Sequence, residues 1–323
     1  MNNLYTMVTG AAGFMGTNLC LNLIAEGNNI IAVDDFTSGS RSNIQLLIDG
    51  ARSKGVELLF IQHDVNDYNS LSRSIPIYAD IPHIYHLACP ASPVFYQRHP
   101  IHTLDTCYLG TRNILDIADV YDSRVVLTST SEVYGDPLVH PQGESYRGNT
   151  SCTGARACYD EGKRIAETLL YNTNRVMGRN HGVVRLFNTY GPFMRFDDGR
   201  FISNFIYASL TGGLHRIYGD GSQTRSICFI DDIVRGLKMM MSSNIEGPIN
   251  LGNPDEHTVM EWSMMISILT RTNHEYVLEP LPQDDPHRRQ PDITLASELL
   301  GWNPEVDART GLLETIDYFR SII

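Results

Sequence analysis

Short apolar runs alternate with helix-like segments through the first half of the 323-residue chain, and this alternation limits the possible folds most strongly. We expect strands at the runs rich in apolar residues: 4–9, 29–33, 57–62, 83–87, 124–130 and 182–187. Helices are expected between them, at residues 14–26, 101–121 and 158–178. Such alternation is typical of βαβ units. It predicts an α/β protein with a doubly wound parallel sheet, a Rossmann fold.

The composition of the sequence changes near residue 190, where Gly, Asp and Arg become frequent and the expected helices and strands become shorter. Open α/β sheets bind ligands at the carboxyl ends of their strands. We therefore expect a Rossmann domain at residues 1–188 and a smaller substrate-binding lobe at 189–323. The boundary is approximate, and we expect segments from one side of it to contribute to the part on the other side. No repeat or low-complexity linker separates the two parts, so we expect one cooperative unit.

Charge and composition restrict the class of partner. The net charge is −12 and the lysines and arginines are scattered, which argues against nucleic acid or an anionic membrane as a partner. The six cysteines show no C-x-x-C spacing, and no basic leader or apolar run of about 20 residues is present. We expect a cytoplasmic protein with free thiols, no bound metal and no membrane helix.

A glycine-rich turn, "VTGAAGFMG", follows the first expected strand and leads into the first helix. Gly10, Gly13 and Gly16 suit a tight turn, close approach of the backbone to a pyrophosphate, and close packing of helix on sheet. Their spacing is G-x-x-G-x-x-G, and an ordinary strand-to-helix turn would also explain it. The turn by itself indicates a dinucleotide site only weakly.

Acidic residues after the second and third strands strengthen this interpretation. Asp34 ends the second strand, where a carboxylate binds the adenosine ribose hydroxyls, and Asp35 beside it would repel a 2′-phosphate. We therefore predict NAD rather than NADP, although Arg41 is close. Asp64 follows the third strand and could contact adenine, or simply be a solvated residue at a strand end.

Tyr159 and Lys163 stand four residues apart in the expected helix 158–178, so they share one helix face. A tyrosine that acts as a base near pH 7 needs its pKa lowered by about three units, worth about 4 kcal/mol. The Lys163 ammonium and an oxidised nicotinamide ring would both favour the phenolate. Alone, this spacing arises often by chance.

The fifth expected strand ends in hydroxyl side chains and an acid, within "LTSTSEVYG". Hydroxyls among Thr128–Ser131 could hydrogen-bond a substrate hydroxyl and pass its proton to Tyr159. They could equally cap the turn that follows the strand. Together with the glycine turn and Asp34, they stand in the order required for NAD-dependent oxidation of an alcohol.

From Met7 to the C-terminus, the sequence resembles the extended short-chain dehydrogenase/reductase superfamily and, within it, the UDP-glucuronate decarboxylases, also called UDP-xylose synthases. The most specific segments are "YHLACPASPVFYQ", "STSEVYGDPLVHPQGE", "CYDEGKR", "FNTYGP", "DGRFISNFI", "YGDGSQTRS", "NLGNPDEHT" and "DDPHRRQPDI". The resemblance implies oxidation of the sugar at C4 by NAD, loss of the C5 carboxylate as carbon dioxide, and return of the hydride to give UDP-xylose. It also implies a homodimer that pairs through residues 101–121 and 158–178.

The resemblance further implies a role for individual residues. The catalytic set is Tyr159, Lys163, Thr130, Ser131, Glu132 and Arg289. The cofactor set adds Phe14, Met15, Ser38, Gly39, Val65, Leu87, Ala88, Thr106 and Thr189 to the glycines and to Asp34, Asp35, Asp64, Tyr159 and Lys163. The set for the UDP-sugar is Pro90, Tyr96, Asn188, Arg200, Tyr218, Arg225 and Arg289.

Three departures from the family pattern affect the expected substrate site. Asp105 and Cys107 stand where the family usually has Lys and Asn, so Arg98 or Arg147 would have to compensate for the lost positive charge. Arg147 itself replaces a Trp, with "SCTGA" following where an Asn-Pro-Ile-Gly-Pro-like run is usual. Asp35 and the shortened "DDFTSG" replace an Asn and an aromatic residue.

Rival interpretations keep the same redox core. A nucleotide-sugar 4,6-dehydratase shares the Tyr-Lys pair but normally has Asp-Glu where this chain has Ser131 and Glu132. An epimerase would leave Arg289 without a purpose. A catalytically weak protein that binds NAD and a nucleotide sugar would follow if the changes at Asp105 and Cys107 removed activity.

Overall fold

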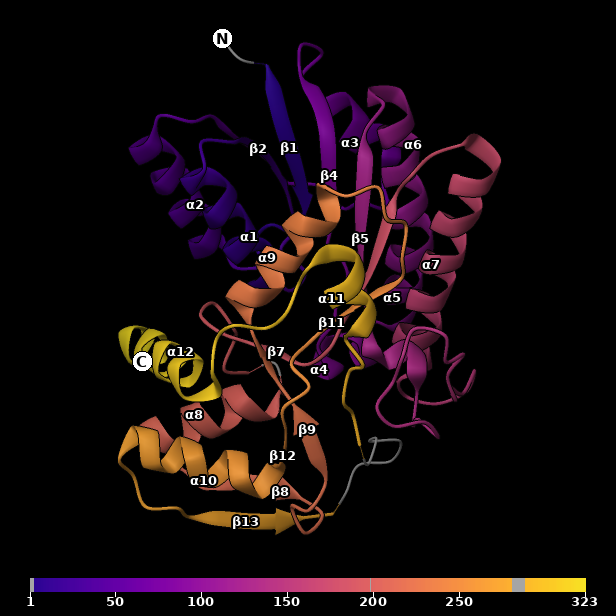
Figure 1. Ribbon diagram of the computed structural model, residues 1–323. Helices are drawn as coiled ribbons and strands as arrows, with labels where there is room; N and C mark the ends of the chain where they lie inside the picture. The colour runs from indigo at the N-terminus through magenta and orange to yellow at the C-terminus, as the bar shows by residue number, and fades with distance from the viewer. Residues whose placement is uncertain (1–2, 198, 281–287) are drawn as a thin grey trace.

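The computed structural model describes residues 3–197, 199–280 and 288–323, and its elements are drawn in Figure 1. Asp198 and residues 284–287, which begin two of the segments matched above, lie outside this description. Within the described ranges, a seven-stranded parallel sheet has the order β11-β6-β5-β4-β1-β2-β3. Its strands are β1 (Leu4–Thr9), β2 (Asn29–Val33), β3 (Leu58–Ile61), β4 (Asp80–His86), β5 (Arg124–Thr130), β6 (Gly182–Leu186) and β11 (Ile249–Leu251). The predicted doubly wound fold is confirmed.

Helices cover both faces of this sheet (Figure 1). One layer holds α1 (Phe14–Ala25), α2 (Arg41–Lys54) and α9 (Ile230–Met241); the other holds α3 (Tyr68–Ser74), α6 (Thr111–Tyr121) and α7 (Ala157–Met177). Successive side chains of a strand point to opposite faces. In β1, Met7 accordingly packs into the core under α6 and α7, and Val8 into the core under α1 and α9. Burial on both faces explains why the strands are apolar throughout.

The helix expected at residues 101–121 is confirmed, and it contains one local irregularity. It consists of α5 (Pro100–Asp105), a π-helical turn at Thr106–Gly110, and α6. The turn packs tightly on its neighbours, because a Cβ atom at Gly110 would lie 2.8 Å from Val65 Cγ2. The apolar spacing of the sequence does not indicate this extra residue in the helix, so the π-helical turn was not predicted.

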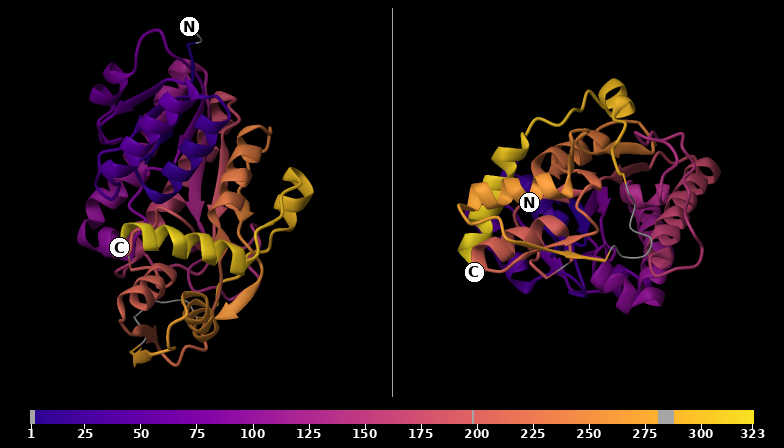
Figure 2. Two further views of the ribbon diagram at one scale, coloured as in Figure 1. Left: turned by 90° about the vertical axis from the view of Figure 1, so that its left-hand side faces the viewer. Right: turned by 90° about the horizontal axis from the view of Figure 1, so that it is seen from below.

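A smaller lobe lies below the carboxyl ends of the strands in Figure 1, and the side view of Figure 2 shows α12 running across this boundary. Its elements are α8 (Phe201–Thr211), β8 (His215–Tyr218), β9 (Thr224–Ser226), β12 (Glu256–Thr258), α10 (Val259–Thr270), β13 (Tyr276–Glu279) and α12 (Ala308–Ile322). The remaining short elements are α4 (Pro93–Arg98), a 3-10 turn (Ser131–Tyr134), β7 (Thr189–Tyr190), β10 (Cys228–Phe229) and α11 (Thr294–Leu300).

Segments from the second half of the chain return to the sheet. β11 pairs with β6, and α9 packs against β5 and β6. The sheet and the lobe are therefore linked by several chain crossings.

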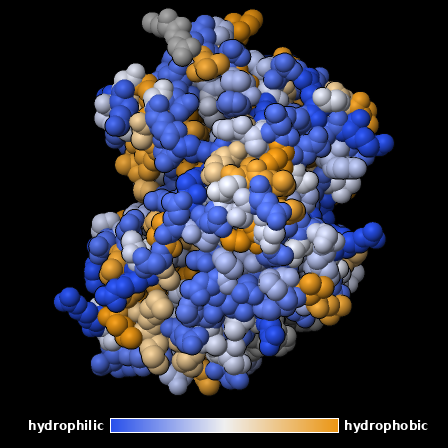
Figure 3. Space-filling model, viewed as in Figure 1, coloured by the Kyte–Doolittle hydropathy of each residue, from blue (hydrophilic) through white to orange (hydrophobic). Residues whose placement is uncertain are grey.

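The exterior is mixed in character. Figure 3 shows a mainly hydrophilic face with scattered apolar patches. Among the described residues, no helix combines the length and apolar composition that spanning a bilayer requires.

Candidate active site

The turn between β1 and α1 is closely packed and depends on glycine at two positions. Gly10 has φ +70°, a left-handed conformation, and its Cβ would lie 3.0 Å from the Ala88 backbone nitrogen. A Cβ at Gly16 would lie 2.1 Å from the Gly10 carbonyl oxygen, so no side chain fits there. The turn can thus present the backbone of the α1 N-terminus, beginning at Gly13, to an anionic ligand.

A groove with a cavity of about 440 Å³ runs from this turn across the carboxyl ends of β2, β3 and β4. It is lined by most of the predicted cofactor residues: Gly10, Gly13, Phe14, Met15, Gly16, Asp34, Asp35, Ser38, Asp64, Val65, Leu87, Ala88 and Thr106. Gly39 does not line it but packs beside it, where a Cβ would lie 2.7 Å from Asp34 Oδ1. Pro90, predicted for the substrate, lines this groove as well.

Asp34 is held rigidly at the end of β2. Its Oδ2 accepts a hydrogen bond from the Ala12 backbone nitrogen at 2.9 Å, and its Oδ1 accepts one from Phe36 at 2.8 Å. Burial raises the pKa of Asp34, and the charge of Asp35 adds to this effect, although the backbone hydrogen bonds oppose it. Each carboxylate oxygen still has a free lone pair for a ribose hydroxyl.

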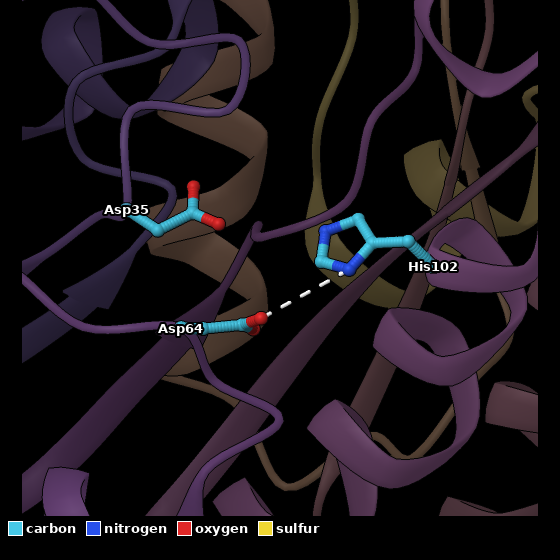
Figure 4. A group of neighbouring side chains, drawn as sticks. All are labelled: Asp35, Asp64 and His102. Atoms are coloured by element: carbon cyan, nitrogen blue, oxygen red, sulfur yellow. Dashed lines mark ion pairs between the residues drawn. The ribbon is translucent and has the colours of Figure 1, made fainter. Parts of the chain in front are cut away.

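Asp35, Asp64 and His102 converge at the same end of the groove (Figure 4), with ligand atoms within 4.8 Å of one another. His102 comes from α5, and its Nδ1 lies 3.9 Å from Asp64 Oδ2. Sequence reasoning did not find His102, because nothing in its neighbourhood on the chain indicates a site. Asp64 adds a third carboxylate to Asp34 and Asp35, from which the repulsion of a 2′-phosphate was predicted.

A second cavity, of about 820 Å³, opens beside the groove and shares Phe14, Met15, Leu87 and Cys89 with it. It gathers the remaining predicted residues: Tyr96, Thr130, Ser131, Glu132, Tyr159, Lys163, Asn188, Thr189, Arg200, Tyr218, Arg225 and Arg289. The lobe supplies Tyr218 and Arg225, and the sheet and α7 supply Thr130, Tyr159 and Lys163. The cavity therefore lies between the two parts of the molecule.

Tyr159 and Lys163 lie on the buried face of α7. The Lys163 Nζ donates a hydrogen bond to the Thr128 carbonyl oxygen at 2.9 Å and lies 6.0 Å from the centre of the Tyr159 ring. Burial raises the pKa of Tyr159 well above its ordinary value and a charge on Cys89 raises it further, whereas a hydrogen bond with Thr130 lowers it. The direction is opposite to the one a base requires, so the chain alone does not produce the phenolate.

The hydroxyl side chains at the end of β5 divide between different partners. Thr130 reaches Tyr159, but the Ser129 Oγ donates to Glu167 and the Thr128 Oγ1 donates to the His86 carbonyl oxygen. All four residues, Thr128 to Ser131, nevertheless line the second cavity, as expected for hydroxyls at the end of this strand. Thr130 is the hydroxyl placed to act with Tyr159.

Glu132 and Arg289 form a buried ion pair that joins the 3-10 turn after β5 to a segment 157 residues away. The Arg289 Nη2 donates to Glu132 Oε2 at 2.9 Å, and its Nη1 contacts Oε1. Arg156, at the start of α7, donates to the same carboxylate. Burial alone would raise the pKa of Glu132, but the two guanidinium groups lower it to about 2.

Arg156 was missed by sequence reasoning, although one signal was available. It caps the N-terminus of α7, where a cation is disfavoured by the helix dipole. Asp160, one turn further on, is also buried, and its Oδ1 has no hydrogen-bond partner among the described residues. Burial and the charge of Glu132 raise the pKa of Asp160 to about 7.

The predicted substrate residues surround this centre in different ways. The Tyr96 ring stacks on the Tyr159 ring, with 5.1 Å between centroids and 6° between planes. Arg225 is buried and donates to the Thr224 carbonyl oxygen at 2.8 Å, whereas Tyr218 is 40% exposed at the mouth. Arg98 and Arg147 are exposed and do not line the described cavity, so neither replaces a lysine at position 105; Asp105 is exposed too.

The chain has close relatives among characterised proteins. A family model described as GDP-mannose 4,6 dehydratase matches residues 7–315. UDP-glucuronic acid decarboxylase 6 of Arabidopsis thaliana is 45% identical over 96% of this chain and 87% of the relative. UDP-glucuronic acid decarboxylase 1 of Danio rerio is 45% identical over 97% of this chain and 72% of the relative.

Solved structures share the fold over nearly the whole chain. The UDP-glucose 4-epimerase of Thermotoga maritima, solved with UDP-glucose, has a TM-score of 0.90 at 27% identity, covering 98% of this chain and 99% of that one. The dTDP-glucose 4,6-dehydratase DesIV of Streptomyces venezuelae has a TM-score of 0.87 at 24% identity, covering 98% and 97%, and supports the fold alone.

The sheet, the glycine turn and the Tyr-Lys pair define an enzyme of the extended short-chain dehydrogenase/reductase class. The identity of the relatives is specific within this class. The chain belongs to the family of the UDP-glucuronic acid decarboxylases.

Proposed function

We propose that this protein is an NAD-dependent decarboxylase that converts UDP-glucuronate to UDP-xylose. The observation that carries the proposal is a single cavity in which Tyr159 and Thr130 lie beside the Glu132–Arg289 ion pair. The first pair suits oxidation of an alcohol, and the arginines suit a substrate that carries a carboxylate and a diphosphate. The names of the relatives at 45% identity support the same substrate.

The groove fits NAD in shape and in the chemistry of its donors. The side-chain-free turn at Gly10 and Gly16 admits a pyrophosphate at the N-terminus of α1, and Asp34 can bind the ribose hydroxyls. When bound, NAD accepts a hydride from the sugar and later returns it.

In the first step, Tyr159 removes the proton from the C4 hydroxyl while Thr130 holds that hydroxyl by a hydrogen bond. The chain keeps the pKa of Tyr159 high by burial, so a further positive charge is needed beside the ring. Lys163 is already present in the chain, so the further charge would have to come from the oxidised nicotinamide ring of bound NAD. The base would therefore become active when cofactor and sugar are both in place.

In the second step, the 4-keto group stands β to the C5 carboxylate, so carbon dioxide can leave with its bonding electrons held as an enolate. Arg289 and Arg156 lie where they can orient that carboxylate. Glu132 is ionised at neutral pH because its pKa is about 2. It acts as the charge that aligns the two guanidinium groups rather than as a proton donor.

The nucleotide would extend toward the lobe. Arg225 and Arg200 offer guanidinium groups for the diphosphate, and the half-exposed Tyr218 ring offers a face for uracil. The lobe would thus set which sugar nucleotide enters, whereas α7 and β5 supply Tyr159, Lys163 and Thr130 for the oxidation.

We also propose a homodimer in the cytoplasm. Apolar side chains are exposed on α5 to α6 and on α7, and pairing these helices between two copies would cover them. The exposed set is Ile101, Leu104, Tyr108, Leu109, Val120, Ile165, Tyr171, Val176 and Met177.

Product analysis tests the proposed function. The purified protein is incubated with NAD and, in parallel, with UDP-glucuronate or dTDP-glucose, and released carbon dioxide and the sugar product are measured. We expect carbon dioxide and a UDP-pentose from the first substrate only. A 4,6-dehydrated hexose from dTDP-glucose, with UDP-glucuronate untouched, would overturn the proposal in favour of a dehydratase.

A further inference from the structure

Two thiols meet at the point where the groove and the second cavity join. The Sγ atoms of Cys89 and Cys107 lie 3.3 Å apart, and both cysteines are free. Cys89 follows β4 and lines both cavities, so a small molecule that enters either one reaches its sulfur. Cys107 is buried on the π-helical turn, 18 residues away along the chain.

This pair is close to disulfide geometry. A disulfide has a sulfur–sulfur distance of about 2.05 Å, so the two atoms need to approach by roughly 1.2 Å. The π-helical turn aims Cys107 inward, since a Cβ atom at Gly162 of α7 would lie only 3.0 Å from the Cys107 sulfur. Gly162 is therefore the position that lets the turn pack against α7 with its thiol beside Cys89.

The surroundings favour reaction at Cys89 over Cys107. The hydrogen bond from the Cys107 thiol, and beyond it the charge of Lys163, lower the pKa of Cys89, although burial opposes this. The same hydrogen bond together with burial raises the pKa of Cys107. The thiolate is the nucleophilic form of cysteine, so Cys89 is the sulfur that attacks.

We propose that Cys89 and Cys107 are a modification site for hydrogen peroxide, which converts the pair to a reversible disulfide that slows the chemistry at Tyr159. The Cys89 thiolate attacks one peroxide oxygen, the O–O bond breaks, and hydroxide leaves as a sulfenic acid forms. The Cys107 sulfur then displaces the sulfenic oxygen as water and forms the disulfide. Two thiols are oxidised and one peroxide is reduced to two waters.

The disulfide would disturb the active site directly. Cys89 packs in one cluster with Tyr96 and Tyr159, and Cys107 rests on α7 one residue before Lys163. A shift of about 1 Å in such a site can lower a rate by roughly 100-fold. We therefore expect turnover to fall at least tenfold in the oxidised protein and to recover on reduction.

Peptide mapping tests the proposal on the full-length protein. The protein is treated with hydrogen peroxide, free thiols are alkylated, and trypsin cleaves after Arg98, which separates Cys89 (residues 74–98) from Cys107 (residues 99–112). We expect the two peptides to be joined, and dithiothreitol to release them and to restore turnover. In Cys107→Ser the joined peptides should be absent, because the Cys89 sulfenic acid then has no neighbouring thiol with which to condense.

Cys152→Ser is the matched control, because Cys152 is an exposed thiol remote from the pair along the chain. It should behave as the wild type does in both measurements. Unjoined peptides after peroxide treatment would overturn the proposal, and so would joined peptides with unchanged turnover. The peptide map needs no substrate, so its outcome is separate from whether UDP-glucuronate is the substrate.

Discussion

Replacing Arg156 with methionine removes one of the two guanidinium groups that hold Glu132. Arg156 and Glu132 are both largely buried, with 18% and 13% of their side chains exposed, and Arg289 remains as a second partner. A hydrogen bond to a charged group contributes about 1.5–3 kcal/mol to stability. Loss of a sole buried partner costs about 3–5 kcal/mol, which sets the upper limit. We expect Arg156→Met to lower the free energy of unfolding at pH 7 by about 2–3 kcal/mol.

The pH dependence of this loss follows from the Glu132 carboxyl. Its pKa falls from an ordinary value of 4.5 to about 2 in the folded protein. Its stabilising contribution is therefore complete above about pH 4.5 and is lost as the pH falls through 2. Without Arg156, the folded pKa moves back toward its ordinary value. The difference between wild type and variant should be widest above pH 5 and should narrow toward pH 2.

Urea denaturation at pH 7 and at pH 3 measures both quantities. Arg147→Met is the control, because Arg147 is an exposed arginine from the loop just before α7; it should change stability by less than about 0.5 kcal/mol. A similarly small loss for Arg156→Met at pH 7 would refute the reasoning. An equal loss at both pH values would show that Arg156 acts through packing rather than through the charge of Glu132.

Three further outcomes follow from the site. Tyr159→Phe should keep its affinity for NAD, measured by calorimetry, while losing turnover by at least about 100-fold, because the general base is removed and the ring remains; unchanged turnover would exclude Tyr159 from the mechanism. Asp160→Asn should stabilise the protein at pH 8, by up to about 4 kcal/mol, and have little effect below pH 4. The pKa of Asp160 is raised to about 7, so its unfavourable ionisation costs stability as the pH rises from about 4 through 7; an equal effect at both pH values would contradict that assignment. Gly16→Ala should destabilise the turn and weaken NAD binding, because the new Cβ would lie 2.1 Å from the Gly10 carbonyl oxygen; unaltered NAD binding would argue against a cofactor in this groove.

The sequence predicted the fold well because burial on both faces makes each strand of this sheet apolar. Each of the six expected strands forms, and the Tyr159 helix runs from residue 157 to 177. β11 was not predicted, because it has only three residues and pairs with a strand that is distant along the chain. The π-helical turn was not predicted, because one extra residue in a helix hardly changes the spacing of its apolar residues.

The residues of the candidate site could be predicted where the spacing of a local motif or the family resemblance indicates them. Thr130, Tyr159 and Lys163 lie together as their order along the chain implied. The direction of the Tyr159 pKa was not predictable, because it depends on how deeply the surrounding structure buries the ring. His102 depends on a contact between distant segments, which no local pattern records, and the one local sign for Arg156 was a cation at the N-terminus of α7.

The central claim is oxidation at C4 followed by decarboxylation and return of the same hydride. UDP-glucuronate carrying deuterium at C4 tests it in one reaction followed by NMR. We predict carbon dioxide release and UDP-xylose that keeps the deuterium at C4. A product that is still a hexuronate or hexose, or a pentose whose C4 deuterium has been lost to the medium, would contradict the account.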